Sequence, residues 1–272
     1  MNKQALQDKA ALIRQHIIRE VYHAGSGHPG GSLSATDIMT VLYFHEMNID
    51  GNDPSNPNRD RFVLSKGHAS PVLYACLAEA GFFPKEDLVT FRKLGSCLQG
   101  HPSMLKLCGV EMSTGSLGQG FSASVGMALA GRLDGRDSRI YVMLGDGELQ
   151  EGITWEASMA AAHYGLDNLC AIVDHNGLQI DGKNDDVMRV MPIAEKFRAF
   201  GWNVIELDGH DLDAIAAGFR KAGKHKGAPT VLVAETHKGK GVSFMEDQAG
   251  WHGKAPDREQ AEQAMAELGG IL

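Results

Sequence analysis

Asp146 and Asn176 are the residues whose types and spacing most directly suggest chemistry in this sequence. Asp146 lies between two glycines in Gly145-Asp146-Gly147, and Asn176 follows 30 residues later, next to Gly177. A carboxylate and an amide oxygen are hard donors, which suit Mg²⁺ or Ca²⁺ when water and phosphate oxygens complete the shell. The flanking glycines let the backbone approach a bulky ligand closely. The pair therefore predicts a divalent-cation site that can hold a phosphorylated ligand.

Two apolar runs and one helix must position these side chains. Residues 140–144 and 169–173 have the length and β-branched content of buried strands, and a helical stretch at about 154–163 lies between them. This arrangement is one β-α-β unit. Because parallel strands end at one edge of a sheet, where open α/β folds bind ligands, Asp146 and Asn176 can converge there.

Two other interpretations of the Gly-Asp-Gly segment are weaker. A dinucleotide-binding loop fits poorly, because an acidic residue inside a phosphate-cradling loop repels phosphate unless a metal bridges them. An ordinary Asp-Gly turn would explain the segment alone. The presence of Asn176 after the next strand favours the metal site instead.

Several of the 12 histidines lie beside glycine or proline rather than inside helical patterns, which favours roles in a site. Segment 25–31 is too rich in glycine for any regular element. Lys66 and His68 form a cation pair before a helix that begins at Ser70-Pro71, which suggests a phosphate site. Other histidines of this kind include His28, His101 and His252.

The segments GDGELQEGITWEA and VDHNGLQIDG resemble the thiamine diphosphate motif of the transketolase family. Pyruvate dehydrogenase-type subunits share the GDG…N skeleton but not the LQEG continuation, and deoxyxylulose-phosphate synthases also differ after GDG. Further segments resemble transketolase motifs in the family's order, from residue 5 to about 265: SGHPGG, RFVLSKGHASP, GHP, TGSLGQG and WHG.

The resemblance implies thiamine diphosphate as cofactor, with its diphosphate held through Mg²⁺, Ca²⁺ or Mn²⁺. The implied metal ligands are Asp146, Asn176 and the main-chain carbonyl of Leu178. The Gly115 carbonyl would accept a hydrogen bond from the aminopyrimidine, and Leu117 would pack against the cofactor's rings. The full implied set of cofactor contacts is Lys66, His68, Gly115, Leu117, Gly145, Asp146, Gly147, Glu151, Asn176, Lys238 and His252.

The implied activity is transfer of a two-carbon ketol group from a ketose, or its phosphate, to an aldose. Four histidines would orient substrate hydroxyls and shuttle protons, since imidazole titrates near neutral pH. These implied catalytic residues are His28, His68, His101 and His252.

Strands and helices alternate along the chain, which predicts an α/β fold: a parallel sheet with helices on both faces. By resemblance this is the thiamine-diphosphate-binding PP-domain type. Ser34 to Asp37 reads as a capping box that opens a helix to about Glu46. The other predicted strands are 61–65, 202–207 and 230–234, and the other predicted helices are 4–24, 84–94, about 120–132, a stretch ending near 224, and 257–268.

Composition limits the classes of function. A net charge of −8 makes nucleic acid an unexpected partner, and no apolar run approaches membrane-spanning length. The four cysteines form no CxxC pair, which argues against a zinc knuckle. Cys76 and Cys170 lie in apolar runs typical of a core, and we therefore expect a protein of the reducing cytosol. The N-terminal stretch reads as an amphipathic helix without a secretory h-region, so we expect a cytoplasmic protein.

The resemblance covers only the diphosphate-binding domain, so residues 1–272 are expected to form one domain. The family's activating glutamate and its sugar-phosphate arginines belong to other domains. Glu151 matches a family glutamate near the subunit interface, and neither it nor Glu156 is expected to be the activating residue. We therefore expect a partner chain, a C-terminal transketolase subunit that carries the pyrimidine-binding domain, in an α2β2 assembly.

Two alternatives remain open from the sequence. The chain could be a subunit of another thiamine-diphosphate enzyme, such as a sulfosugar or unusual-ketose transketolase or an oxo-acid dehydrogenase component. It could also be a non-catalytic paralogue that keeps the fold. Every family residue that can be tested is present, which argues against a decayed site.

Overall fold

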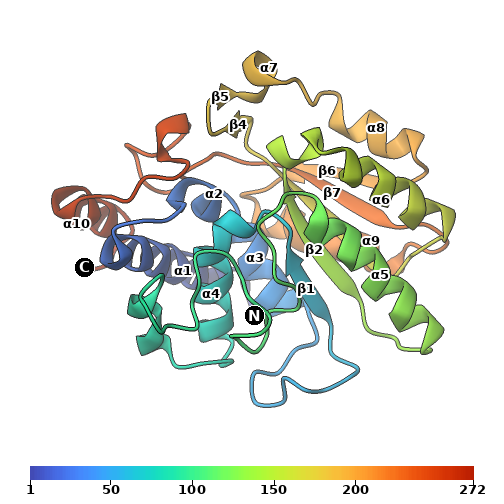
Figure 1. Ribbon diagram of the computed structural model, residues 1–272, viewed down its shortest axis with the longest axis horizontal. Coiled ribbons are helices and arrows are strands. Elements are labelled where there is room, and N and C mark those ends of the chain that lie inside the picture. The colour runs from blue at the N-terminus through green and yellow to red at the C-terminus, as the bar shows by residue number, and fades with distance from the viewer.

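A five-stranded parallel sheet forms the centre of the computed structural model, which describes residues 1–272 (Figure 1). Every adjacent pair of strands is parallel, so all five carboxyl ends lie at one edge. The predicted strands and the parallel sheet are confirmed, with bounds that shift by at most two residues. In spatial order the strands are β1 (Arg61–Leu64), β2 (Ile140–Gly145), β3 (Leu169–His175), β7 (Thr230–Glu235) and β6 (Asn203–Asp208).

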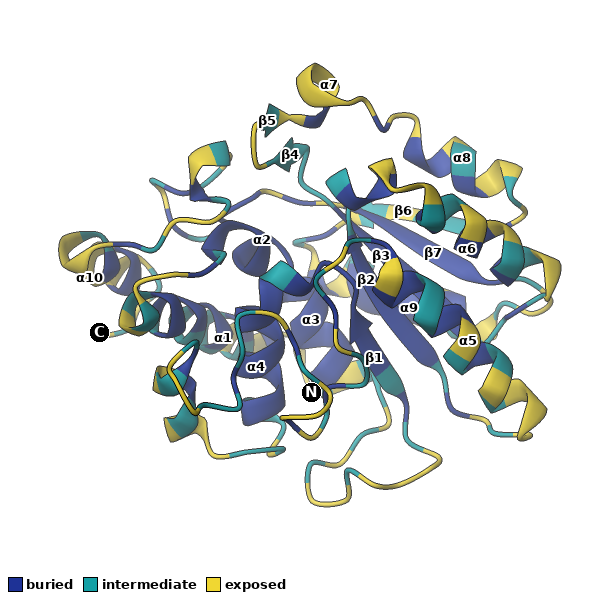
Figure 2. Ribbon diagram, viewed as in Figure 1, coloured by how far each residue is buried: buried dark blue, intermediate teal, exposed yellow.

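Helices cover both faces of the sheet, and alternate strand residues pack into two separate cores. Met143 of β2 belongs to one core, whereas its neighbours Val142 and Leu144 belong to the other. Figure 2 shows the buried sheet covered by helices that expose their outer faces on one side, whereas on the other side the helices Thr36–Val41 and Ser70–Glu79 are buried almost throughout. The first core includes residues of α1 (Lys3–Ala24), α3 (Thr36–Val41), α4 (Ser70–Glu79), α9 (Leu212–Lys224) and α10 (Arg258–Glu267). The second includes residues of α5 (Gln119–Leu133), α6 (Gly152–His163) and α8 (Ile193–Ala199).

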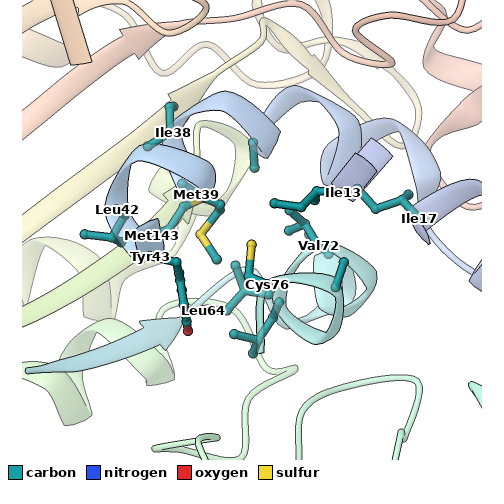
Figure 3. Packing of buried hydrophobic residues seen from close by; sticks show 14 of the residues in the cluster. Ile13, Ile17, Ile38, Met39, Leu42, Tyr43, Leu64, Val72, Cys76 and Met143 are labelled. Carbon is teal, nitrogen blue, oxygen red and sulfur yellow. The ribbon is translucent and has the colours of Figure 1, made fainter. Parts of the chain in front are cut away.

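The first core is built around the predicted apolar face of α1. Ile13 and Ile17 are completely buried and belong to the same packed cluster as Met39 of α3 and Cys76 of α4 (Figure 3). Burial of each such side chain contributes about 1.5–3 kcal/mol to folding. Gly25 then ends the helix in a left-handed conformation, with φ of 62°. The prediction for residues 4–24 is therefore confirmed.

The prediction that segment 25–31 contains no regular element is wrong in part. Residues Pro29–Ser34 form a short helix, α2, in which every residue is buried. Proline at the first position suits a helix start. Gly30 is needed there because a Cβ atom would lie 2.8 Å from the Trp251 carbonyl oxygen. Tertiary packing thus overrides the low helix propensity of two consecutive glycines.

Two predicted helices take a different form. Ser34 caps no helix, because α3 begins at Thr36 without a side-chain cap and the Ser34 hydroxyl instead donates to Asp174. The helix continues to Glu46 through a π-helical turn, η1 (Leu42–Glu46). The predicted helix 84–94 is only a 3₁₀ segment, η3 (Lys85–Thr90), and the chain then turns at Arg92, whose φ is 59°.

The elements that the sequence analysis did not predict include the helix α8 and three small elements near it in the sequence. The short hairpin β4 (Leu178–Gln179) and β5 (Gly182–Lys183) leads into the single turn α7 (Asn184–Val187). Figure 1 shows β4, β5 and α7 close together at the top of the view, with α8 to their right. None of the helices has both the length and the apolar character needed to cross a membrane.

Candidate functional site

A cleft of about 260 Å³ opens at the carboxyl edge of the sheet. It lies where β1, β2, β3 and β7 end, so four segments far apart in the sequence each contribute polar groups. All residues implied by the sequence except His28 and His101 line this cleft. The complete lining is Gly31, Lys66, His68, Gly115, Leu117, Gly145, Asp146, Gly147, Glu148, Gln150, Glu151, Asn176, Leu178, Gln179, Ile180, Lys238 and His252.

Asp146 lies at the end of β2 with 2% of its surface exposed. One carboxylate oxygen accepts from the Gly147 N–H at 2.8 Å and the other from the Gly177 N–H at 2.6 Å. Burial raises the pKa of this carboxyl, while the Asn184 amide and the Gly177 N–H lower it. A cation bound at such a carboxylate would stabilise its ionised form.

Asn176 and Leu178 approach the same point from the end of β3. The Asn176 Oδ1 atom accepts from the Leu178 N–H at 3.1 Å, and the Leu178 carbonyl faces the cleft, where Lys238 Nζ donates to it at 3.1 Å. The Gly177 N–H bond to Asp146 joins this segment to the Gly-Asp-Gly turn. The three oxygen donors implied by the sequence therefore lie in two directly bonded segments.

The residues of this corner fit a divalent cation. The donor set of one carboxylate, one amide oxygen and one carbonyl is the chemistry that Mg²⁺ and Ca²⁺ select. The Asn184 side chain of α7 is also buried beside Asp146, and its Oδ1 atom has no hydrogen-bond partner. An orphaned polar atom next to a buried carboxylate is what an absent polar ligand would leave behind.

Lys66 and His68 do not form the expected pair of free cations. The Lys66 side chain is 1% exposed, and its ammonium donates to Asp174 and to the Gly31 carbonyl. Burial, followed by the Lys66 charge, holds the pKa of His68 well below its ordinary value, so His68 is neutral. The free positive charge at the cleft comes instead from Lys238, whose pKa burial lowers to about 8.

Four histidines gather beside the cleft as the sequence implied. The His28 ring centroid lies 5.3 Å from that of His68, 5.4 Å from that of His252 and 6.3 Å from that of His101. The His68 and His252 centroids are 5.0 Å apart. Segments that end or follow α1, β1, η3 and β7 thus deliver four imidazoles to one wall.

These imidazoles are neutral, which corrects the expectation that they titrate near pH 7. Burial, together with the charges of Arg92 and Lys238, lowers the pKa of His28 to about 4. Burial and Lys238 lower that of His252 to about 3, and burial and Arg92 lower that of His101. Lys238 Nζ lies 2.9 Å from His252 Nδ1, so the ammonium donates to this nitrogen and the ring proton is placed on Nε2. The cluster therefore offers neutral donors and acceptors to a ligand.

The buried neutral histidines predict a loss of stability in mild acid. The unfolded chain binds protons at the ordinary histidine pKa near 6.5, whereas folded His28 and His252 bind them only at about 4 and about 3. Protonation in this window favours unfolding, so their contribution is complete above pH 6.5 and declines as the pH falls toward 4. The melting temperature of the double variant H28Q/H252Q should fall less between pH 7 and pH 4.5 than that of the wild type. Identical pH dependence in the two proteins would contradict this assignment.

Glu148 is a site residue that the sequence analysis did not identify. It is 2% exposed, and its Oε1 atom accepts from the Ser65 hydroxyl and from the Gly118 N–H at 2.8 Å. Its Oε2 atom accepts from the Gly145 N–H at 3.1 Å. This carboxylate joins the end of β1, the turn before α5 and the Gly-Asp-Gly turn. Its position directly after the Gly-Asp-Gly segment could have identified it as a site residue.

The turn before α5 adds Gly115 and Leu117 to the lining of the cleft. The φ of 80° at Gly118 requires glycine, and a Cβ atom there would lie 2.4 Å from the Ile153 side chain. Glu148 joins this turn to the Gly-Asp-Gly segment, because it accepts from the N–H groups of both Gly118 and Gly145. Glu151 also lines the cleft, but it is exposed to solvent, whereas Asp146 and Glu148 are buried.

The comparisons with known proteins agree with this geometry. The family model described as "Transketolase, thiamine diphosphate binding domain" matches residues 6–270. The chain belongs to the transketolase family. The transketolases are enzymes, and the matched region is their thiamine diphosphate binding domain.

Two relatives have nearly the same length as this transketolase-family chain. The 6-deoxy-6-sulfo-D-fructose transketolase subunit SqwG of Clostridium sp. (strain MSTE9) is 45% identical, with 97% of this chain and 96% of the relative aligned. An apulose-4-phosphate transketolase subunit of Phocaeicola vulgatus is 42% identical, with 98% and 95% aligned. Both relatives are named as subunits, so the resemblance to the N-terminal subunit of a split transketolase is confirmed.

The solved structures confirm the fold. The transketolase of Campylobacter jejuni subsp. jejuni superposes on this chain with a TM-score of 0.94 at 36% sequence identity. The match covers all of this chain but only 44% of the solved one. The chain therefore spans less than half the length of a full transketolase.

Proposed function

We propose that this chain is the thiamine-diphosphate-binding subunit of a two-component transketolase. The observation that carries the proposal is the joined pair of segments in which Asp146, Asn176 and the Leu178 carbonyl face one corner of the cleft. In this proposal the three groups hold a divalent cation, Mg²⁺ in the simplest case, with Ca²⁺ or Mn²⁺ as substitutes. The cation in turn neutralises the cofactor's diphosphate.

The remaining residues divide the cofactor's environment into two parts. When bound, thiamine diphosphate supplies the carbon nucleophile for two-carbon ketol transfer, as cofactors carry such chemistry. Lys238 would contribute positive charge toward the diphosphate, since it lines the cleft beside the Leu178 carbonyl. Gly115 and Leu117, which also line the cleft, would contact the cofactor's rings.

The histidine cluster is proposed to bind the sugar. Neutral imidazoles of His28, His68 and His101 can each donate one hydrogen bond and accept another, which suits the hydroxyls of a ketose. His252, whose Nδ1 atom accepts from Lys238, can donate from Nε2. The buried His28 Nδ1 atom has no protein partner and so remains available to a ligand. Because these rings are neutral before the substrate binds, a ring nitrogen could accept a proton directly from a substrate hydroxyl.

The proposed assembly includes a second polypeptide. Residues 1–272 form a single domain in this proposal, and a C-terminal transketolase subunit supplies the pyrimidine-binding domain in an α2β2 complex. The open cleft, with Glu151 exposed at its rim, supports completion by another chain. Sugar-phosphate recognition would then depend mainly on the partner.

The substrate class is proposed to extend beyond common sugar phosphates. The two relatives of similar length are named for 6-deoxy-6-sulfo-D-fructose and for apulose 4-phosphate. A donor panel for the reconstituted complex should therefore combine ordinary ketose phosphates with sulfonated and branched ketoses. A non-catalytic role would predict turnover of none of them.

Calorimetric titration with thiamine diphosphate tests the proposal directly. The chain is titrated in Mg²⁺ and again in a chelator, first alone and then with the candidate partner subunit present. We expect binding that requires the metal. Equal affinity in the chelator would contradict the metal site, and absence of binding even with the partner would contradict the cofactor assignment.

A further inference from the structure

Asp174 is a completely buried carboxylate at the end of β3 that does not line the cleft. Its Oδ1 atom accepts from the Thr236 hydroxyl at 2.5 Å, and its Oδ2 atom accepts from the Ser34 hydroxyl at 2.5 Å and from the Lys66 ammonium. A fourth donor is the Asn176 Nδ2 atom at 3.3 Å. Segments after β1, β3 and β7 and the end of α2 therefore meet at this one side chain.

The groups around Asp174 show that it acts as an acceptor. The Lys66 ammonium and the Ser34 and Thr236 hydroxyls all donate to its two oxygens. A carboxylate engaged in this way offers lone pairs only and can receive several hydrogen bonds. Whatever else faces Asp174 must consequently present a donor.

This requirement determines the orientation of the Asn176 amide. The Nδ2 atom faces Asp174 and the Ser34 hydroxyl oxygen, each at 3.3 Å. Oδ1 must then point to the other side, where it accepts from the Leu178 N–H and faces the cleft. A flipped amide would place Oδ1 against the carboxylate, where two acceptors repel, and would present an N–H₂ group to a cation.

The same carboxylate neutralises the cation beneath the cleft. The Lys66 ammonium is almost inaccessible and is engaged by Asp174 and the Gly31 carbonyl. Without its partner, the buried charge would lie unpaired close to the cation corner, and both effects would weaken binding of a metal. Residues that orient a metal ligand from behind commonly change metal affinity by 10- to 100-fold.

We propose that Asp174 is the positioning residue of the metal site: it holds the Asn176 amide with its oxygen toward the cation and keeps Lys66 paired below it. This inference rests on the proposed metal- and cofactor-binding function. It assigns the orientation of a metal ligand to a residue that itself touches neither metal nor cofactor. The signature of this role is a further loss of metal affinity when the carboxylate is removed from a protein that already lacks the lysine.

The test compares two variants that differ only at residue 174. Removal of the carboxylate alone would leave Lys66 as an unpaired buried charge, so we compare the double variant K66M/D174L with K66M. Leucine is used because asparagine would keep an acceptor oxygen for the Asn176 Nδ2 atom. Mn²⁺ affinity is measured by electron paramagnetic resonance at saturating thiamine diphosphate, with the partner subunit present and folding checked by circular dichroism. K66M/D174L should bind Mn²⁺ about 10- to 100-fold more weakly than K66M. Equal affinities in the two variants would overturn the proposal.

The wild-type protein provides a separate measurement that does not depend on how well a variant folds. The Asn176 side-chain N–H₂ resonances, assigned by their loss in N176D, should exchange slowly with solvent in the metal-free protein because they donate to Asp174 and Ser34. Rapid exchange would contradict the proposed orientation. If the wild-type complex binds no Mn²⁺ in the presence of thiamine diphosphate, the proposed function itself fails, and slow exchange would then leave only a structural role for Asp174.

Discussion

Replacing Asp146 by alanine is expected to weaken metal-dependent binding of thiamine diphosphate by more than about 100-fold, since even residues behind a metal ligand commonly contribute 10- to 100-fold. Asp146 carries the only negative charge among the three proposed ligands, and the other two are neutral oxygens. Its removal also frees the backbone N–H groups of Gly147 and Gly177, which now donate to it. The measurement is calorimetric titration with the cofactor in Mg²⁺.

The matched control is D181A, which removes an exposed acid from the nearby β4–β5 turn. D181A should bind the cofactor as the wild type does. Loss of two buried hydrogen-bond partners should cost D146A about 1–3 kcal/mol of stability, so thermal melts must show that the variant remains folded at the titration temperature. Cofactor affinity in D146A within tenfold of the wild type would remove Asp146 from the site.

The strands, and the meeting of Asp146 and Asn176 at their ends, were predictable because a buried parallel strand has a recognisable sequence pattern. The runs at 140–144 and 169–173 are continuous and apolar, since both faces of each strand are covered. The end of such a run is therefore visible, and the polar residue that follows it lies at the ligand-binding edge. This local logic located Asp146 and Asn176 without any knowledge of what surrounds them.

The partners of the buried polar groups were not predictable by the same logic. Asp174 precedes Asn176 by two residues, but its role depends on Ser34, Lys66 and Thr236, which are distant in the sequence. Lys66 looked like a free cation because a sequence does not display its counter-charge. Protonation states were hidden for the same reason, because burial and neighbouring charges lower the histidine pKa values.

The short glycine-rich helix α2 was not predictable from the helix propensities of its residues. Helix α2 contains Gly30 and Gly31, which disfavour a helix in isolation by about 1 kcal/mol each. Glycine is nevertheless required at residue 30, because a Cβ atom there would lie against Lys238 and Trp251. His28, at the start of this helix, lies beside the cleft that Lys238 lines, so the failure of the local rule coincides with the candidate site.

The isolated chain, supplied with thiamine diphosphate and Mg²⁺, is expected to transfer ketol groups about 10²- to 10⁴-fold more slowly than the reconstituted complex, the range associated with a missing general acid–base group. The carboxylates of the cleft are committed elsewhere: Asp146 accepts from two backbone N–H groups, and Glu148 from three donors. Glu151 is exposed at the rim. In the two-component proposal, the acid that protonates the cofactor's aminopyrimidine is supplied by the partner.

A titration of this chain with the candidate C-terminal subunit distinguishes the possibilities. Ketol transfer should rise with added partner and saturate at a 1:1 ratio, and light scattering should give the mass of an α2β2 complex. The control is the isolated partner, which lacks the metal corner and should be inactive. Transfer by this chain alone at the rate of the complex would contradict the two-component proposal. A loss of more than about 100-fold in the E151Q complex would place the missing acid on Glu151 of this chain, since removal of a general acid has that magnitude.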